Sequence, residues 1–155
     1  MKTNEKNVEV LNDLIKINND RVAGYEKAAK QTEIIDADLR SIFSSMAAES
    51  RTYANELSRY VNQAGETPTD STTVSGKIYR AWMDVKATFN GNDRKSILEA
   101  CEYGEDAAQK AYKAALESDS DNRLSTDVRH VITEQKTKLK KSHDQIKAMR
   151  DAQPA

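Results

Sequence analysis

Apolar side chains recur every three or four residues along four long stretches of the chain, which is the spacing of an amphipathic helix. Between residues 5 and 31, for example, apolar positions recur at this spacing as Val8, Leu11, Leu14, Ile15, Val22, Tyr25 and Ala29. The chain has only five glycines and two prolines, and most of them lie between the stretches, so little within a stretch would stop a helix. No stretch sustains the period-two alternation of a strand. The sequence therefore predicts an all-α fold.

The pattern predicts a single domain over residues 1–155, with long helices at about 5–31, 36–64, 93–117 and 125–150 and a short helix at about 76–89. Each long helix would measure about 40 Å at about 1.5 Å per residue. Tight turns join the first two and the last two long helices, whereas a long connection separates the pairs. This arrangement indicates a ferritin-like four-helix bundle with one long crossover that contains the short fifth helix. An up-down-up-down bundle with a decorated loop is the alternative.

Charge and composition exclude several classes of partner. The 24 basic and 25 acidic residues leave a net charge of −1, so no overall field would attract nucleic acid or an anionic membrane. The longest uncharged run, residues 41–48, is far shorter than the roughly 20 residues that cross a bilayer. The single cysteine, Cys101, fits a reducing compartment, and the N-terminus lacks the apolar segment of a secretory signal. We therefore expect a cytoplasmic protein.

The inward positions at mid-helix are the place to look for a metal centre. Ferritin-like bundles that bind two metal ions use a Glu from each of two helices and a Glu-x-x-His motif from each of the others. Here these positions hold one carboxylate and no histidine: Asn18, Ser50, Glu105 and Gln135, with Tyr53 and Lys138 where the motif requires His. Iron, manganese and zinc need more carboxylate or imidazole ligands. We therefore expect no metal cofactor, and a structural polar layer in which Glu105 pairs with Lys138 or is hydrogen-bonded by its polar neighbours.

Two other uses of the bundle core stay open. A centre of iron, manganese or zinc would use carboxylates that flank the inward stripe, namely Glu26, Glu49, Glu102 and Glu134, although neither Glu49 nor Glu134 has a His three residues later. A small-molecule carrier would hold its ligand between the helices, near Tyr25, Tyr53 and Tyr112. Cys101 lies on an apolar stripe and is expected to be a buried structural thiol. His130 and His143 are expected at the surface or its boundary, since no Cys or second His stands at ligand spacing.

Two glycines lie inside predicted helices, where each costs about 1 kcal/mol relative to alanine. These are Gly24 and Gly104, both on the side away from the inward stripe. Small residues at such positions admit the close approach of another helix. We expect the 76–89 helix, anchored by Trp82, or a second copy of the chain in a homo-oligomer, to pack there. A tolerated surface glycine is the alternative at each position.

Several segments together resemble a bacterial family of four-helix-bundle proteins. They include Gly24-Tyr25-Glu26-Lys27-Ala28 and Tyr53-Ala54-Asn55-Glu56-Leu57 in the first half of the chain. The more specific ones lie in the second half, namely Trp82-Met83-Asp84-Val85-Lys86 and the Glu-x-Gly-Glu-Asp stretch of Cys101-Glu102-Tyr103-Gly104-Glu105-Asp106. They resemble the domain of unknown function 2383, a family of the ferritin-like superfamily, over nearly the whole chain. The resemblance implies the crossover topology, and it carries no established activity to any residue.

We therefore predict a non-catalytic structural or interaction protein, and kinship with the family suggests a place in a stress response. A metal-binding or oxidase-type ferritin-like protein is one alternative, and a small-molecule carrier is the other. No nucleic-acid or membrane partner is expected.

Overall fold

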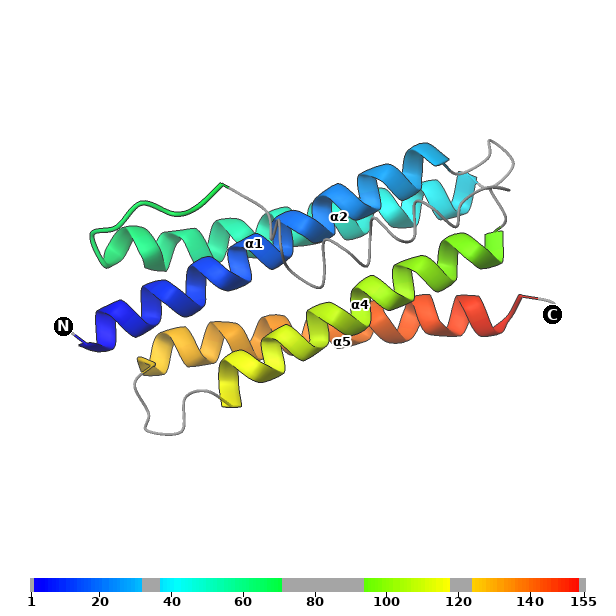
Figure 1. The fold of residues 1–155 in the computed structure, drawn as a ribbon. Coiled ribbons are helices and arrows are strands. Elements are labelled where there is room, and N and C mark those ends of the chain that lie inside the picture. Colours follow the sequence, from blue (N-terminus) through cyan, green and yellow to red (C-terminus); the bar gives the residue numbers. More distant parts are fainter. Residues whose placement is uncertain (1, 32–36, 71–93, 118–123, 154–155) are drawn as a thin grey trace.

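The computed structural model describes residues 2–31, 37–70, 94–117 and 124–153, and this part of the chain forms four long helices. They are α1 (Lys2–Gln31), α2 (Ala37–Gln63), α4 (Arg94–Glu117) and α5 (Thr126–Asp151). Figure 1 shows two antiparallel hairpins, α1–α2 and α4–α5, and α1 contacts α4 while α2 contacts α5. The predicted all-α bundle is confirmed, whereas the expected short helix at 76–89 lies outside the described residues.

The directions of the helices require a crossover between the two hairpins. α2 ends at the end of the bundle where α1 begins, whereas α4 begins at the opposite end, so α2 and α4 run parallel (Figure 1). This is the single-crossover topology that the long connection predicted. The alternative bundle, in which all consecutive helices are antiparallel, is therefore wrong.

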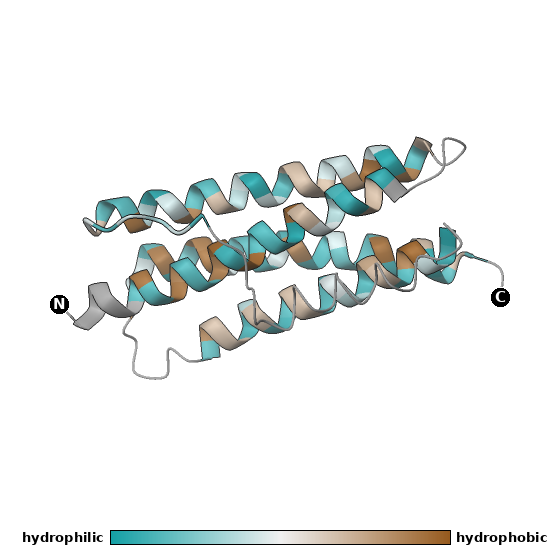
Figure 2. Cartoon of the chain, turned by 45° about the horizontal axis from the view of Figure 1, so that its top comes forward, coloured by the Kyte–Doolittle hydropathy of each residue, from teal (hydrophilic) through white to brown (hydrophobic). Residues whose placement is uncertain are grey.

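The core lies where the apolar stripes of the four helices meet, and Figure 2 shows hydrophobic residues interleaved with hydrophilic ones along each helix. Its most deeply buried side chains include Leu14, Ile15, Leu39, Phe43, Leu57, Ile97, Leu98, Ile132, Leu139 and Ile146. Burying one such side chain stabilises the fold by about 1.5–3 kcal/mol relative to leaving it exposed. The two hairpins are therefore held together mainly by these stripes.

Local sequence defines two of the helix ends. Gly65 follows α2 with φ of 82°, a conformation that favours glycine, and its N–H donates to the Asn62 carbonyl at 2.9 Å. Ser125 precedes α5 as its N-cap, and its hydroxyl accepts a hydrogen bond from the Val128 N–H at 3.3 Å. Glycine and serine thus end one helix and begin another close to the expected bounds of the 36–64 and 125–150 helices.

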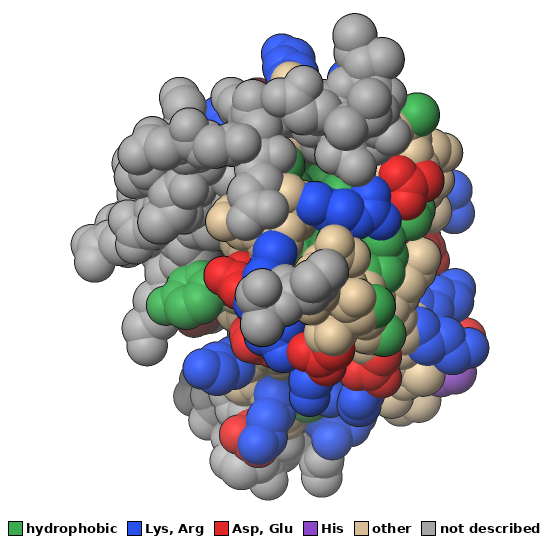
Figure 3. Space-filling view, turned by 90° about the vertical axis from the view of Figure 1, so that its right-hand side faces the viewer, with side chains coloured by type: hydrophobic (Ala, Val, Ile, Leu, Met, Phe, Trp, Pro, Cys, Tyr) green, Lys and Arg blue, Asp and Glu red, His purple; other side chains and the backbone are tan. Residues whose placement is uncertain are grey.

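Charged side chains cover the outer faces of the helices. Figure 3 looks at one end of the bundle and shows acidic and basic side chains next to one another on its described part. This mixture is what a net charge of −1 from 24 basic and 25 acidic residues leads one to expect. None of the helices that the structure describes is long and apolar enough to cross a membrane.

Candidate functional site

A buried polar layer lies in the middle of the bundle. Five of the six residues expected in it expose at most 4% of their surface: Asn18, Ser50, Tyr53, Glu105 and Gln135. The sixth, Lys138, is exposed. The inward stripe of α5 continues from Gln135 to the buried Leu139, so Lys138 lies on the outer side of that helix. The expected pair between Glu105 and Lys138 is therefore not formed.

Glu105 is instead paired with Arg21, a residue of α1 that the apolar pattern did not indicate. Both side chains are only 1% exposed. Two guanidinium nitrogens contact the carboxylate, Nε with Oε1 and Nη2 with Oε2, the second at 3.2 Å. Arg21 Nη1 donates to Ser50 Oγ at 2.6 Å and to the Met46 carbonyl oxygen at 3.4 Å, both on α2. Arg21 therefore joins three helices at the centre of the bundle.

A second carboxylate, Glu49 on α2, extends this network to α5. Its Oε1 lies 2.9 Å from Arg21 Nη2. Glu49 also accepts hydrogen bonds from the Ser142 hydroxyl at 2.9 Å and from the Tyr53 hydroxyl at 3.0 Å. Its side chain is 25% exposed, and it borders a pocket of about 270 Å³ between α2 and α5 that Ser41, Ser45 and Gln145 also line. One guanidinium and two carboxylates give the network a net negative charge.

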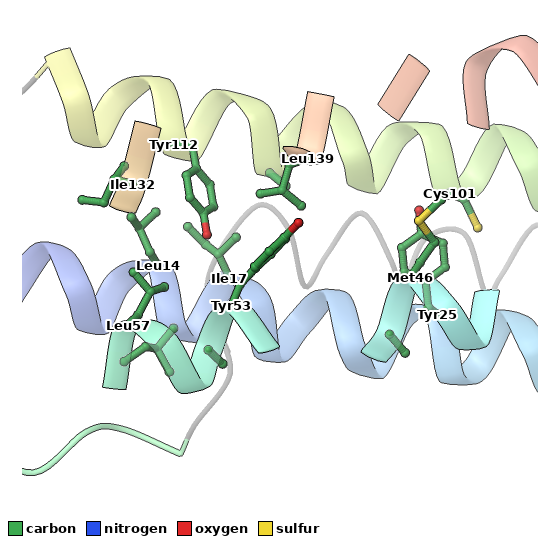
Figure 4. Close-up of a cluster of buried hydrophobic side chains, with 14 of the residues drawn as sticks. Leu14, Ile17, Tyr25, Met46, Tyr53, Leu57, Cys101, Tyr112, Ile132 and Leu139 are labelled. Atoms are coloured by element: carbon green, nitrogen blue, oxygen red, sulfur yellow. The ribbon is translucent and has the colours of Figure 1, made fainter. Parts of the chain in front are cut away.

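Arg21 keeps its charge although it is buried. Its Cζ lies 5.2 Å from the centroid of the Tyr25 ring, a cation–π geometry. Burial by itself lowers the pKa of Arg21, but the charges of Glu105 and Glu49, the hydrogen bond with Glu105 and the interaction with Tyr25 together outweigh that effect, so the pKa is raised overall. Burial raises the pKa of Tyr25 and of Cys101, so both groups are neutral and Cys101 is no thiolate nucleophile. Figure 4 shows Tyr25 and Cys101 together with Met46 in this part of the core.

A chain of hydrogen bonds forms a second polar network beside the arginine. Asn18 Nδ2 donates to the Tyr112 hydroxyl oxygen at 2.8 Å, and that hydroxyl donates to Gln135 Oε1 at 2.7 Å. Gln135 Nε2 in turn donates to the Tyr53 carbonyl oxygen at 3.3 Å. The Tyr53 hydroxyl contacts Glu49, so Tyr53 links the two networks, and Figure 4 shows Tyr53 and Tyr112 entering the core from different helices. The expected layer therefore consists of two linked networks.

The sequence contains a signal for Arg21. Six buried positions of α1 follow one another at alternating steps of three and four residues: Leu11, Leu14, Asn18, Arg21, Tyr25 and Ala28. Arg21 occupies an inward position of this stripe, which has the spacing of a heptad repeat. A single arginine within an apolar stripe is easily interpreted as an exposed residue that interrupts the stripe. Only the carboxylates on α2 and α4 show why it is buried.

The four carboxylates considered as an alternative metal set are not brought together. Each pairs with a different basic side chain: Glu49 with Arg21, Glu26 with Arg51, Glu102 with Arg150, and Glu134 with His130. Glu26 and Glu134 are also exposed. In the ranges that the structure describes, one group of three acidic, histidine or cysteine side chains has ligand atoms within 4.8 Å of one another. Of the four carboxylates of the alternative set, that group contains only Glu102.

The structure describes the two glycines that were expected at a packing surface, but not the segment that was expected to pack against them. Gly24 and Gly104 are both buried. Trp82, the expected anchor against them, lies outside the described residues. The packing of the 76–89 segment or of a second copy at these glycines stays a prediction.

The course of the helices and the central polar layer define a ferritin-like four-helix bundle. A mutant of Dps1 from Mycobacterium smegmatis matches with a TM-score of 0.78 at 13% identity, over 96% of this chain and 97% of that one. A ferritin-like, diiron-carboxylate protein from Bacillus anthracis matches with a TM-score of 0.73 at 15% identity, again over 96% and 97% of the two chains. Identities this low show the fold alone.

Within that fold class the family is also defined. Residues 6–118 match the family described as a domain of unknown function, DUF2383, and the chain belongs to this family, as its resemblance predicted. No curated protein matches the chain.

Proposed function

We propose that the protein is a ferritin-like bundle that works without a dinuclear metal centre, as a non-catalytic structural or interaction protein. The observation that carries this proposal is the guanidinium of Arg21, which pairs with both Glu105 and Glu49 at mid-height of the bundle. A dinuclear centre in this fold uses four carboxylates and two histidines. The central layer of this chain offers two carboxylates, and an arginine contacts both of them, so its residues do not fit such a centre.

Electrostatics supports the same conclusion. A divalent ion about 4 Å from a guanidinium would be repelled by about 8 kcal/mol at an effective dielectric constant of about 20. The guanidinium would have to leave first, yet Arg21 is 1% exposed and donates hydrogen bonds to Glu105 and Ser50. In bundles of this fold that bind metal, the ions neutralise the buried carboxylates. In this chain the guanidinium of Arg21, a side chain of α1, has that role.

The interaction part of the proposal is self-association in a homo-oligomer. Tyr103 is 63% exposed on α4 and lies next to Gly104 in the sequence. Exposed aromatic residues are enriched at protein interfaces. A cytoplasmic location, based on the single cysteine, and a stress-related role, based on the family resemblance, belong to the same proposal.

A carrier function receives less support from the three core tyrosines. The hydroxyls of Tyr53 and Tyr112 donate to Glu49 and Gln135, and the ring of Tyr25 packs against Arg21. These groups are engaged with the protein itself, so we do not propose a ligand between them.

Metal analysis tests the first part of the proposal. The protein is purified without a chelator, and its iron, manganese and zinc contents are compared with those of a Glu105→Gln variant and of a control, Glu9→Gln, whose side chain is exposed and belongs to no candidate metal set. We expect the three proteins to contain the same amount of metal and to oxidise iron(II) at the same rate. About two equivalents of metal that are lost in Glu105→Gln alone would refute the proposal, provided that circular dichroism shows the variant to be folded.

Light scattering tests the second part. We expect a mass of more than one copy over a range of protein concentrations, and a smaller mass for a Tyr103→Glu variant. A protein that is monomeric at every concentration would remove self-association from the proposal.

A further inference from the structure

A histidine and two carboxylates meet between α4 and α5, outside the central networks. Glu102 and Asp106 stand one turn apart on α4, and His143 reaches them from α5. One ligand atom of each lies within 4.8 Å of the other two, and His143 Nε2 is 2.5 Å from Asp106 Oδ1. The side chains of Glu102, His143 and Asp106 are 11%, 17% and 50% exposed, so the cluster has a buried side and an open side.

These ligand types suit a single transition-metal ion. Zinc bonds to imidazole nitrogen and carboxylate oxygen at about 2.0–2.2 Å, which places tetrahedral ligand atoms about 3.4 Å apart. The three ligand atoms lie within 4.8 Å of one another, so binding requires the 2.5 Å separation between His143 Nε2 and Asp106 Oδ1 to open and any separation longer than about 3.4 Å to close. Three protein ligands would leave a fourth position for water. One imidazole and two carboxylates also suit iron(II) and manganese(II).

The other nitrogen of the His143 ring supplies an independent observation. Nδ1 lies 3.1 Å from Asp144 Oδ1, and an ionised carboxylate can only accept a hydrogen bond from it. In the neutral ring the lone pair of Nε2 then faces the carboxylate of Asp106. Two acceptors that face each other need a proton or a cation between them; a proton on Nε2 fills this place in the metal-free protein, and a metal ion would replace that proton. Histidines that bind metals almost always donate their second N–H to a carboxylate, a backbone carbonyl or water, which fixes the tautomer and the ring orientation, and Asp144 is a partner of this kind.

Arg150 is a competitor for the same site, and it differs from Arg21. From the last turn of α5 it contacts Glu102, but it is 30% exposed. It also pairs with Asp151, whose Oδ1 lies 2.7 Å from Arg150 Nη2. The guanidinium can therefore release Glu102 and stay paired with Asp151 in contact with water. Arg21, at 1% exposed, has no comparable position.

We propose that Glu102, Asp106 and His143 bind one divalent transition-metal ion between α4 and α5, with Zn²⁺ bound more tightly than Mn²⁺. Asp144 orients the imidazole, and Arg150 covers Glu102 when no ion is bound. The site is independent of the central layer, where the proposed function places no metal.

Titration of the metal-free, full-length protein with Zn²⁺ tests this site. We expect about one equivalent to bind at neutral pH, with a shift of the His143 ring resonances in NMR spectra. A His143→Ala variant should bind at least about tenfold more weakly. His130→Ala is the matched control, because His130 is exposed on the same helix and has a single carboxylate neighbour, Glu134. Failure of the wild type to bind Zn²⁺, or an equal effect of the two variants, would overturn the proposal.

Two further variants separate a metal site from a plain ion-pair cluster. Asp144→Asn should weaken Zn²⁺ binding, because it removes the acceptor that orients the ring, and Arg150→Ala should strengthen it several-fold. If both variants bind Zn²⁺ as the wild type does, the assigned roles are wrong. Failure here is distinguishable from failure of the proposed function, because metal in the core would depend on Glu105 and metal at this site on His143.

Discussion

The guanidinium of Arg21 on α1 and the carboxylate of Glu105 on α4 form a two-nitrogen ion pair in which each side chain is 1% exposed. Both groups lose their water on burial, and this loss offsets most of their attraction, so a buried ion pair adds little stability relative to an apolar pair. A displaced arrangement of α1 and α4 would, however, leave a buried charge without a partner. We therefore infer that the pair helps to specify how the two hairpins face each other.

Removing one member of the pair should be costly. Arg21→Ala leaves Glu105 buried without its counter-charge, and we expect the free energy of unfolding to fall by about 3–5 kcal/mol. Arg51→Ala is the control, because Arg51 pairs with Glu26 while both are about half exposed, and it should cost less than about 1 kcal/mol. Urea denaturation followed by circular dichroism measures both values. Equal losses in the two variants would contradict the role given to Arg21.

Replacing both members should be much less costly. In the double variant Arg21→Met, Glu105→Met, no buried charge loses its partner at this contact, and two flexible apolar side chains fill the space. Glu49 would keep the hydroxyls of Ser142 and Tyr53 as donors and its 25% exposure to water. We expect the double variant to recover most of the stability lost in Arg21→Ala. A loss of stability equal to the sum of the losses in the single variants Arg21→Met and Glu105→Met would show that the two sites are not coupled.

The hydroxyl of Tyr112 connects Asn18 to Gln135, so its removal leaves two buried polar groups without one of their partners. We expect Tyr112→Phe to lower the free energy of unfolding by about 1–3 kcal/mol. Tyr103→Phe, at a position that is 63% exposed, should have almost no effect. Thermal or urea unfolding of the two variants gives the comparison. A Tyr112→Phe variant as stable as the wild type would mean that the hydrogen-bond chain adds nothing.

His143 should make the stability of the metal-free protein depend on pH. Burial by itself lowers the pKa of His143, but the hydrogen bonds with Asp144 and Asp106 raise it overall above its ordinary value of 6.5. A histidine whose pKa is higher in the folded than in the unfolded protein stabilises the fold in its protonated form. This contribution is complete below the unfolded pKa and is lost as the pH rises through the folded pKa.

The measurement is the free energy of unfolding between about pH 5.5 and 8.5 in the presence of a chelator. We expect the wild type to lose stability relative to a His143→Gln variant as the pH rises through the neutral range. Asp144, whose pKa is lowered by hydrogen bonds from His143 and Lys140, titrates at lower pH and does not interfere. Parallel curves for the two proteins would contradict the raised pKa of His143.

The fold could be predicted because its two determinants are local. Apolar spacing decides which segments are helices, and the lengths of the connections decide which helices are antiparallel neighbours. The inward positions of Asn18, Ser50, Glu105 and Gln135 follow from the same stripes, and all four are buried. The expectation for Lys138 was wrong because a residue three positions after an inward one can be either buried or exposed. On α5 the buried positions that follow Gln135 are Leu139 and Ser142, so Lys138 faces solvent.

The partners of the site residues could not be predicted in the same way. The spacing along α1 places Arg21 on the inward stripe, but it does not show that Glu105, 84 residues further along the chain, faces Arg21 across the core. The surface cluster has the same limitation. The one-turn spacing of Glu102 and Asp106 is visible in the sequence, but the approach of His143 depends on how α5 is rotated against α4.

The crossover topology has a consequence for the order of folding. The hairpins α1–α2 and α4–α5 are made of helices that are neighbours in sequence, whereas the ion pair of Arg21 and Glu105 closes a loop of 84 residues. Contacts between distant parts of a chain form late, because the entropy of closing the loop must be lost first. An interaction that forms after the transition state slows unfolding and leaves the folding rate almost unchanged. We therefore expect the buried arginine to slow unfolding and so to lengthen the time that the bundle stays folded once it has assembled.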